Sequence, residues 1–541
     1  MLLIAARKDE KDTLAGGLFN ELRARAGEEF EFIAADDFCG GTRRPESDRF
    51  LYLPSFTSEG MIPDMVEAER VCRRMARIEN AKVVVVSSAL VYGIGPGRQA
   101  LVDEEYSAPR KGSDTVCAAW SKFEALTIQH LNSQTRLTIL RPVTVVPSES
   151  LLSNLLRRRF VPTLPGHDAT LQLLSPGDLA RAVCCAFAGD KVGIFNVAPD
   201  QAVSTHAAIR LAGSTRIPLP RTLLRLQKGP EILDYVRYPW TVSNRKIRKE
   251  LGFTPAKTSL AALLEARGGR VTADPEPVFD EFGMDRKYID FYGANLFKFL
   301  ADIYWRIETR GLEHVPRSGR AVLVGMHRGF MPWDGVMALH LIARKLGRYP
   351  RFLVHPGLLK FPFLSNFMTK LGGVVACRDS AARILEKEGL LGIFPEGIEG
   401  AFTPYRDAYK LKEFGRHAFV KMALQHRAPI VPFVTVGSAE IFPILGKINS
   451  KRWSQYADWP CIPLTPTFPI IPLPLPSKWH TIFLPPIHVE DIYPPEAARD
   501  RSIVKAISAD VQAQMQKAID EMLARRRSIF WGSLFPAGGE Q

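Results

Sequence analysis

The sequence contains no run of about 18 uninterrupted apolar residues, so it predicts no membrane-spanning helix. It also lacks a secretory signal pattern, because its short apolar start, residues 1–6, precedes the first charged cluster instead of following one. Seven cysteines are scattered without a CxxC pair or a nearby histidine cluster. Their distribution argues against zinc or a disulfide framework and favours a reducing compartment. We therefore expect a cytoplasmic protein that meets a membrane only peripherally, at its inner face.

Size and composition describe a globular protein with more than one domain. The chain has 541 residues, 46% of them hydrophobic and 24% charged, which excludes a disordered protein and exceeds a single hydrophobic core. Its formal net charge of +14 attracts polyanions such as nucleic acid and anionic lipid headgroups. A nucleic-acid-binding protein would need a basic stripe with stacking aromatics or a recognition motif, and the sequence contains neither. We therefore expect a membrane surface, and no nucleic acid, as a partner.

The first half of the chain alternates short β-rich runs with helical patterns, which is typical of an α/β fold with a mostly parallel sheet. The sequence predicts strands over 2–5, 30–34, 82–87, 137–140 and 193–196, and a helix over 61–77. Apolar periodicity stops, and glycine and proline gather, over residues 268–277. We therefore expect a Rossmann-like, doubly wound domain over 1–267, a linker over 268–277 and a second α/β domain over 278–541.

The second half contains two long helical patterns and one segment that cannot form a regular helix. Aromatic and aliphatic residues recur at helical spacing over 285–306, a stripe more typical of core packing than of membrane contact. Prolines at nearly every third position predict a long apolar loop over 459–479. A final helix over 495–527 ends in three arginines, and Ile-Phe-Trp follows at 529–531. Basic residues beside aromatic ones fit an anchor at a membrane interface.

Two short motifs in the second half carry the chemistry. Residues 327–334 read His-Arg-Gly-Phe-Met-Pro-Trp-Asp, and Phe-Pro-Glu-Gly follows at 394–397. His327 comes after an apolar run that predicts a strand, so its imidazole would lie at the strand's carboxyl end, where α/β sheets bind ligands. A neutral imidazole can take a proton from an attacking hydroxyl, and Asp334 would fix its tautomer and stabilise the imidazolium. Glu396, in a tight Pro-Gly turn, would orient a polar substrate.

Four ordered blocks carry a family resemblance: residues 325–335, 372–378, 393–397 and 428–432. They resemble the lysophospholipid and glycerol acyltransferase superfamily, of the bacterial 1-acylglycerol-3-phosphate acyltransferase type. The resemblance implies catalytic roles for His327 and Asp334. It further implies that Arg378, Glu396 and Gly397 bind the acceptor, with the arginine as a bidentate partner for a phosphate. The family usually places four residues between the histidine and the aspartate, whereas six intervene here, a spacing that resembles a divergent branch.

Motifs in the first half carry a second resemblance: Ser-Ser-Ala-Leu-Val-Tyr-Gly at 87–93, Trp-Ser-Lys-Phe-Glu at 120–124 and Leu-Arg-Pro at 140–142. They resemble an extended short-chain dehydrogenase of the NAD-dependent epimerase/dehydratase type, which implies its fold. Two parts of the chemistry are missing. The tyrosine expected four positions before Lys122 is Ala118, and charged residues 7–11 stand where a glycine-rich turn would approach a pyrophosphate. We therefore expect no productive NAD(P) binding, and a role as scaffold, substrate recruiter or regulator.

These observations predict an O-acyltransferase of phospholipid or lipid biosynthesis. It would move a fatty acyl group from acyl-CoA or acyl carrier protein to a glycerolipid-type hydroxyl, on a lysophosphatidate-like acceptor. The prediction includes no cofactor besides the acyl donor, and no metal. Two alternatives stay open. One is an NAD(P)-dependent oxidoreductase or epimerase that uses the first half. The other is a non-catalytic lipid-binding scaffold, in which the wide spacing from His327 to Asp334 reflects lost chemistry.

Overall fold

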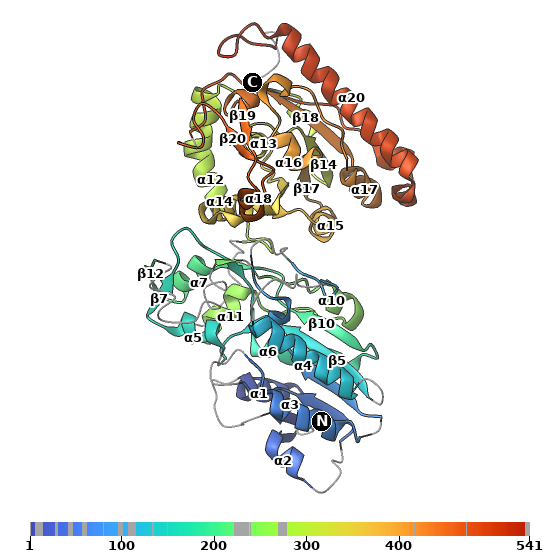
Figure 1. The fold of residues 1–541 in the computed structure, drawn as a ribbon. Coiled ribbons are helices and arrows are strands. Elements are labelled where there is room, and N and C mark those ends of the chain that lie inside the picture. The colour runs from blue at the N-terminus through green and yellow to red at the C-terminus, as the bar shows by residue number, and fades with distance from the viewer. Residues whose placement is uncertain are drawn as a thin grey trace. The chain divides into compact units, whose positions relative to one another are not determined.

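The computed structural model divides into two compact units, Met1–Gly283 and Met284–Gln541, and Figure 1 shows a sheet in each. It describes residues 2–5, 14–26, 31–41, 47–56, 62–78, 80–95, 101–106, 115–131, 135–148, 150–220, 237–238, 240–268, 279–415, 417–471 and 473–535. Of the linker expected over 268–277, only Gly268 lies within these ranges. The charged residues 7–11 also lie outside them.

The first unit is built on a six-stranded parallel sheet. Its strands are β1 (Leu2–Ala5), β2 (Glu31–Ala34), β3 (Arg49–Tyr52), β4 (Lys82–Val86), β5 (Arg136–Pro142) and β10 (Gly193–Val197). They lie in the order β10-β5-β4-β3-β1-β2, and every pairing is parallel. The order therefore reverses direction along the chain between β1 and β3, as in doubly wound folds. The Rossmann-like α/β fold predicted for this half is confirmed.

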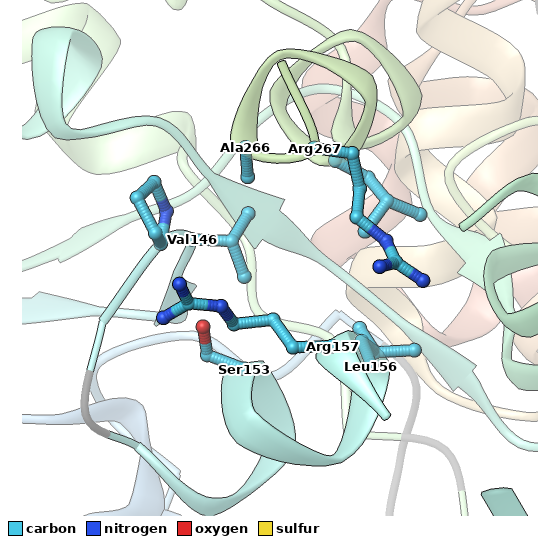
Figure 2. A pocket seen from close by; sticks show the side chains of 8 residues that line it. Val146, Ser153, Leu156, Arg157, Ala266 and Arg267 are labelled. Carbon is cyan, nitrogen blue, oxygen red and sulfur yellow. The ribbon is translucent and has the colours of Figure 1, made fainter. Parts of the chain in front are cut away.

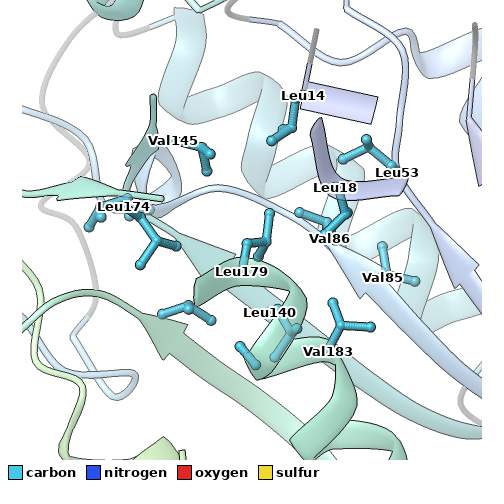
Figure 3. Close-up of a cluster of buried hydrophobic side chains, with 14 of the residues drawn as sticks. Leu14, Leu18, Leu53, Val85, Val86, Leu140, Val145, Leu174, Leu179 and Val183 are labelled. Atoms are coloured by element: carbon cyan, nitrogen blue, oxygen red, sulfur yellow. The ribbon is translucent and has the colours of Figure 1, made fainter. Parts of the chain in front are cut away.

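Helices and short strands complete this unit. The helices are α1 (Leu14–Ala26), α2 (Ala35–Gly40), α3 (Met65–Met75), α4 (Thr115–Leu131), α5 (Leu151–Arg157), α6 (Pro176–Ala188), α7 (Thr205–Leu211), α10 (Arg245–Leu251) and α11 (Ser259–Ala266), with the 3-10 turn η2 (Ala89–Tyr92). The short strands are β6 (Thr144–Val145), β7 (Phe160–Thr163), β8 (Thr170–Leu171), β9 (Leu173–Leu174), β11 (Val203–Ser204) and β12 (Thr215–Pro218). Figure 3 shows part of the core, where Leu18 of α1 and Leu179 of α6 meet Val86 of β4. Each such buried aliphatic side chain contributes roughly 1.5–3 kcal/mol.

The second unit contains a seven-stranded mixed sheet with the site-bearing strand near its centre. The strands are β13 (Glu308–Arg310), β14 (Ala321–Gly325), β15 (Arg351–Val354), β16 (Val374–Val375), β17 (Leu390–Ile393), β18 (Ile430–Val436) and β21 (His480–Phe483). Their order is β13-β21-β18-β14-β17-β15-β16, and only the β18–β21 pairing is antiparallel. β14 therefore lies between β17 and β18, and the carboxyl ends of these three parallel strands share one edge.

Helices surround this sheet, and a long one at the C-terminal end contacts β18 (Figure 1). They are α12 (Arg286–Tyr292), α13 (Trp333–Leu346), α14 (Pro362–Lys370), α15 (Arg378–Glu386), α16 (Gly397–Ala401), α17 (Ala418–Gln425), α18 (Lys451–Ala457), α19 (Val489–Ile492) and α20 (Arg501–Arg525). Single helical turns are η5 (Leu312–His314), η6 (Pro356–Lys360), η7 (Tyr405–Asp407), η8 (Ser438–Glu440) and η9 (Pro495–Arg499). Among the described helices, none is long and apolar enough to cross a membrane.

The helix predicted over 285–306 is present, but its apolar stripe does not all face the core. After α12 the helix continues through two π-helical stretches, η3 (Gly293–Phe297) and η4 (Leu300–Tyr304). Phe297 is fully buried, whereas Phe291 and Ile303 are 64% and 63% exposed. The core-packing interpretation of the stripe is therefore wrong for its exposed half. From Gly293 onward, the π turns add about one residue per turn and shift the buried face away from the 3.6-residue pattern.

The proline-rich segment is mostly irregular, as its sequence predicts. One short strand within it, β20 (Ile462–Leu464), was not predicted, and it pairs antiparallel with β19 (Gly446–Ile448). Among its described residues, three large aliphatic side chains are more than half exposed: Ile470, Ile471 and Leu473. The segment therefore presents apolar side chains to solvent.

Candidate active site

His327 and Asp334 lie at the edge of the sheet where β14 ends. His327 follows the last residue of β14 by two positions, and Asp334 is in the first turn of α13. Nδ1 of the imidazole is 2.9 Å from Oδ2 of the carboxylate, and the aspartate is 2% exposed. Among the described residues, the hydrogen bond found for the His327 ring is the one at Nδ1. The two residues predicted to be catalytic are thus in direct contact, with one ring nitrogen left for a substrate.

The six residues between them form a tight turn. Gly329 has a φ of +73° and Phe330 a φ of +32°, a region that L side chains rarely adopt. A Cβ on Gly329 would also approach the carbonyl oxygen of Ser438 to 3.2 Å. The N–H of Phe330 donates to the Ala401 carbonyl over 2.9 Å, which ties the turn to α16. The turn thereby absorbs the two extra residues and returns the carboxylate to the imidazole.

Arg328 links this turn to the Phe-Pro-Glu-Gly motif. Its guanidinium donates to both carboxylate oxygens of Glu396, over 2.7 and 3.0 Å, and both side chains are 1% exposed. Its backbone N–H donates to Asp334 Oδ2 over 2.8 Å, and its Nη1 donates to the His327 carbonyl over 2.8 Å. The N–H of Lys412 adds a 2.8 Å hydrogen bond to Glu396. Bidentate, buried and fully hydrogen-bonded pairs of this kind fix geometry.

Both carboxylate oxygens of Glu396, a predicted acceptor-binding residue, therefore accept hydrogen bonds from Arg328. The contact of Glu396 with an acceptor stays a prediction. Gly397 follows it with a φ of +62°, and its N–H donates to the Phe394 carbonyl over 3.0 Å, closing the turn. Because nothing lies within 4 Å of a Cβ placed on Gly397, the backbone conformation is what favours glycine there. Gly400 is limited by space instead, since its Cβ would lie 2.6 Å from Cβ of Glu396.

Arg378, the predicted phosphate partner, is the first residue of α15. Its side chain is exposed, and the described residues give it no ion pair. The alternative of a salt bridge with Asp379 or Glu386 is therefore not seen. Guanidinium groups and helix N-termini both favour anions, so the position suits a phosphate, and its role stays a prediction.

Aromatic side chains lie beside His327 and in the turn that leads to Asp334. The Phe394 ring lies 5.2 Å from the His327 ring, and Phe352 stacks on Phe394 at 5.5 Å. Within the turn that joins the two residues, Phe330 packs against Phe468, at 4.8 Å, and against Trp459, at 5.8 Å. The imidazole thus has one aromatic ring beside it, and the turn itself packs against a second aromatic cluster.

Arg328 is the functional residue that sequence reasoning missed. It lies next to His327 inside the first motif, but its partner Glu396 is far away in the sequence. Only the pairing of β14 with β17, in register Ala321 with Leu390, brings the two motifs together. A parallel sheet model that aligned the two strands would have supplied the signal.

The first unit has its own buried polar cluster, at the carboxyl ends of β4, β5 and β10. Arg141 donates to both carboxylate oxygens of Glu124, over 2.8 and 2.6 Å, and to the Tyr92 hydroxyl over 2.7 Å. Ser87 donates to Glu124 over 2.6 Å, and Tyr92 donates to Asn196 over 2.7 Å. These groups lie where α/β sheets bind ligands, yet they bind one another.

A pocket in the same unit is too small for a nucleotide. Its lining includes Arg157, Arg267 and Leu156 (Figure 2). The cavity volume is about 10 Å³, roughly the space of one water molecule, whereas ligand sites span ~300–1,000 Å³.

The two positions that correspond to the Tyr-Lys pair of the dehydrogenases lie in one helix. Ala118 lies in α4, and Lys122, four residues on, is exposed.

Solved structures similar to this chain include epimerase-type proteins. Human epimerase family protein SDR39U1 with NADPH has a TM-score of 0.42 and 17% identity, covering 50% of this chain and 100% of that chain. MoeE5 in complex with UDP-glucuronic acid and NAD has a TM-score of 0.37 and 16% identity, covering 48% of this chain and 96% of that chain.

Sequence comparisons match one family model and several proteins. An acyltransferase family model matches residues 306–436. The chain is 26% identical over 178 residues to the Bos taurus protein named "DGAT1/2-independent enzyme synthesizing storage lipids", covering 33% of this chain and 53% of that protein. It is 34% identical over 301 residues to the uncharacterized Mycobacterium tuberculosis protein Rv0502, covering 53% of this chain and 82% of that protein. The chain therefore belongs to the same family as this mycobacterial protein, and its second half contains an acyltransferase domain.

Proposed function

We propose that this acyltransferase moves a fatty acyl group from acyl-CoA or acyl carrier protein to a glycerolipid-type hydroxyl, on a lysophosphatidate-like acceptor, in phospholipid or other lipid synthesis. The observation that carries the proposal is the 2.9 Å contact between His327 Nδ1 and Asp334 Oδ2. It leaves Nε2 as the ring atom that can accept a proton. The similarity to a bovine enzyme named for storage-lipid synthesis supports a lipid acceptor. No cofactor besides the acyl donor is required.

In the proposed reaction, the acceptor oxygen attacks the thioester carbonyl carbon while His327 Nε2 takes the hydroxyl proton. The tetrahedral intermediate then expels the thiolate, which receives that proton from the imidazolium. An ester and a free thiol result, and the imidazole returns to its neutral form. Asp334 holds the Nδ1–H tautomer and stabilises the imidazolium. General base catalysis of this kind contributes about 10²- to 10⁴-fold.

Three further residues complete the proposed site. Arg378, exposed at the start of α15, binds the acceptor's phosphate through charge-assisted hydrogen bonds. Glu396 acts through Arg328, whose guanidinium it binds at 2.7 Å, and so fixes the loop that carries His327. Gly397 provides the positive φ, +62°, that the turn requires.

We also propose that the protein works peripherally at the inner face of the cytoplasmic membrane. Support comes from one set of exposed apolar side chains in the second unit, which we name the apolar surface. It comprises Phe291, Leu296, Phe299, Ile303, Ile470, Ile471, Leu473, Phe530 and Trp531, each at least 38% exposed. Clusters of exposed apolar residues mark interaction sites. Aromatic residues beside cations favour the lipid interface.

Direct contacts join the parts of the apolar surface. The Tyr304 hydroxyl donates to the Pro474 carbonyl over 2.8 Å, so the helix ending at Tyr304 meets the proline-rich segment. Arg306 donates to the Phe530 carbonyl over 2.8 Å and lies 5.1 Å from the Trp531 ring centre. Through the contact of Phe330 with Phe468, the same segment reaches the loop of His327. A membrane bound to this surface would therefore lie close to the site.

The proposal is tested by incubating the purified protein with radiolabelled acyl-CoA or acyl carrier protein. The acceptors are a panel of lyso-lipids, monoacylglycerols and sugar-lipids, and products are separated by chromatography. A labelled ester of one acceptor class supports the proposal and identifies the acceptor. Binding to lipid vesicles without any transfer would instead favour the non-catalytic scaffold.

The NAD(P)-dependent alternative is favoured by the Rossmann-like sheet of the first unit, but two features of the site count against it. Ala118 takes the place of the catalytic tyrosine, and the polar cluster around Arg141 is internally satisfied. Thermal shift with NADH and NADPH decides the point. We expect no saturable rise of the melting temperature, and a saturable rise would revive the alternative.

A further inference from the structure

A short segment, residues 405–412, separates the active site from the C-terminal helix α20; we name it the bridging segment. On its active-site side, Nε of Arg328 donates to the Ala408 carbonyl, and Nη2 donates to the Lys410 carbonyl over 3.2 Å. The N–H of Lys412 donates to Glu396 over 2.8 Å. The backbone of this segment thus supplies a large part of the partners of the buried Arg328–Glu396 pair.

On its other side, the bridging segment is bound by one side chain of α20. Gln516 Nε2 donates to the Tyr409 carbonyl over 3.0 Å, and Gln516 Oε1 accepts from the Leu411 N–H over 2.8 Å. Arg328 and Gln516 therefore bond alternate residues of the same stretch, 408 and 410 on one side, 409 and 411 on the other. Because one glutamine bonds both a carbonyl and an N–H of the segment, it fixes the distance between the segment and α20. It also prevents the segment from sliding along the helix.

The two backbone bonds of Gln516, which we name the clamp, can affect the chemistry because the same segment also binds Arg328. Its guanidinium is buried, and a buried cation needs its hydrogen bonds. Displacement of the Ala408 and Lys410 carbonyls would move the guanidinium. Nη1 of Arg328 donates to the His327 carbonyl, and the backbone N–H of Arg328 donates to Asp334 Oδ2. A shift of Arg328 would therefore move both members of the dyad. A displacement of about 1 Å at a reacting group can cost 10²-fold in rate.

We propose that Gln516 is a positioning residue of the active site. It holds the bridging segment in the place that allows Arg328 to fix His327, Asp334 and Glu396, although α20 lies far along the chain from those motifs. The proposal rests on the proposed acyl transfer for its kinetic readout, and on the contacts alone for its structural readout.

The kinetic test compares Gln516→Leu with Gln514→Leu in the full-length protein. Gln514 is the matched control, since it is the same residue type two positions earlier in α20. Among the described residues, its side chain bonds Asp510 within the helix, over 2.9 Å. We expect Gln516→Leu to lower kcat about 10- to 100-fold while KM for the acyl donor changes less than about twofold. Gln516→Glu keeps the acceptor for Leu411 but loses the donor to Tyr409 and to Asp520, which the Gln516 amide meets at 2.8 Å, so its kcat should also fall below that of the wild type. The control should match the wild type.

A wild-type kcat for Gln516→Leu would overturn the proposal. So would a loss that disappears when rates are divided by the folded fraction from circular dichroism, because that is the result of destabilisation alone.

Hydrogen exchange provides a readout that needs no turnover. We expect peptides covering 405–412 and 327–334 to exchange faster in Gln516→Leu than in Gln514→Leu, because the clamp protects their backbone amides. Equal exchange in the two variants would overturn the positioning role. If the wild type transfers no acyl group but the exchange difference is found, the proposed function fails and the clamp stands, so the two failures are distinguishable.

Discussion

At the scale of single residues, the position of Asp334 determines what the imidazole can do. Its carboxylate lies in the first turn of α13, where the helix N-terminus favours negative charge. It accepts from both His327 Nδ1 and the Arg328 N–H. The carboxylate is therefore held in a fixed orientation toward Nδ1, from which it can stabilise an imidazolium.

Asp334→Asn tests this role. An asparagine preserves the size but presents an N–H or a neutral oxygen to Nδ1, so the tautomer with an accepting Nε2 is no longer enforced. We expect kcat to fall about 10²- to 10⁴-fold, with the far-UV circular dichroism spectrum unchanged. Steady-state kinetics with the identified acceptor measure the effect, and a kcat within twofold of the wild type would remove the aspartate from the mechanism.

Two buried histidines outside the dyad predict a pH dependence of stability. Burial lowers the pKa of His340 to about 4, with Arg344 adding to the effect. Burial also lowers the pKa of His480 to about 4, against the opposing effect of Glu308. Histidines of the unfolded chain titrate near ~6.5. Between these values the unfolded chain binds protons that the folded protein does not, so the free energy of unfolding falls as pH decreases from about 6.5 to 4.

The measurement is urea unfolding at pH 7 and pH 5, with His340→Leu as the comparison. The variant should lose less stability between the two pH values than the wild type, because it lacks one of the two depressed groups. An equally steep loss would show that His340 does not contribute.

At the scale of elements, α20 is fastened to the sheet by a buried network. The Tyr409 hydroxyl donates to Glu440 over 2.5 Å and accepts from the Gly437 N–H over 2.9 Å. Burial, and then the charge of Glu440, hold the pKa of Tyr409 well above its usual range, so the phenol stays a donor. Arg526, just past α20, pairs with the same carboxylate. The network joins the bridging segment, η8 and the end of α20.

Glu440→Gln tests the strength of this attachment. The change leaves the buried Arg526 without its counter-ion, so we expect a loss of about 3–5 kcal/mol in the free energy of unfolding. Asp302→Asn is the control, since Asp302 pairs with Arg344 on the surface, with side chains 39% and 43% exposed, and its loss should cost less than about 1 kcal/mol. Chemical denaturation measures both, and equal small losses would contradict the account.

The elements also show what the sequence could predict. Strands β1, β2, β4, β5 and β10 were all predicted, because each is a β-rich run between turn residues. β3 was missed, since Arg49–Tyr52 is only four residues long and begins with a charge. The exposed half of the helix after Arg286 was assigned to the core, because π turns leave no mark in a 3.6-residue pattern.

Site contacts between residues close in the sequence could be predicted, and contacts between distant residues could not. His327 and Asp334 are seven positions apart and their motif could be read directly. The pairing of Arg328 with Glu396 joins distant motifs, and the contacts of Gln516 come from still farther along the chain. Such tertiary contacts follow from strand order and helix packing, which local patterns do not encode.

At the scale of the whole molecule, a basic chain carries an exposed apolar surface. The net charge of +14 favours anionic bilayers, and the apolar surface supplies side chains to insert. In the full-length protein, we expect the double variant Ile470→Asp and Leu473→Asp to bind vesicles of phosphatidylcholine and phosphatidylglycerol at least about tenfold more weakly than the wild type. Vesicle sedimentation measures binding without an acyl donor.

The control for this prediction is Ile492→Asp. Ile492 is 67% exposed in the same unit but outside the apolar surface, so this single aspartate adds half of the double variant's charge change without removing an inserted side chain. Binding like that of the wild type is expected for the control. Equal binding of all three proteins would exclude the apolar surface as the membrane contact.

The most direct test of the central claim is the rate of acyl transfer by His327→Ala, compared with the wild type at equal folded fraction. If the imidazole is the general base, transfer should fall by about 10²- to 10⁴-fold while the melting temperature stays within a few degrees. Transfer at the wild-type rate would contradict the account, because the hydroxyl would then lose its proton to some other group.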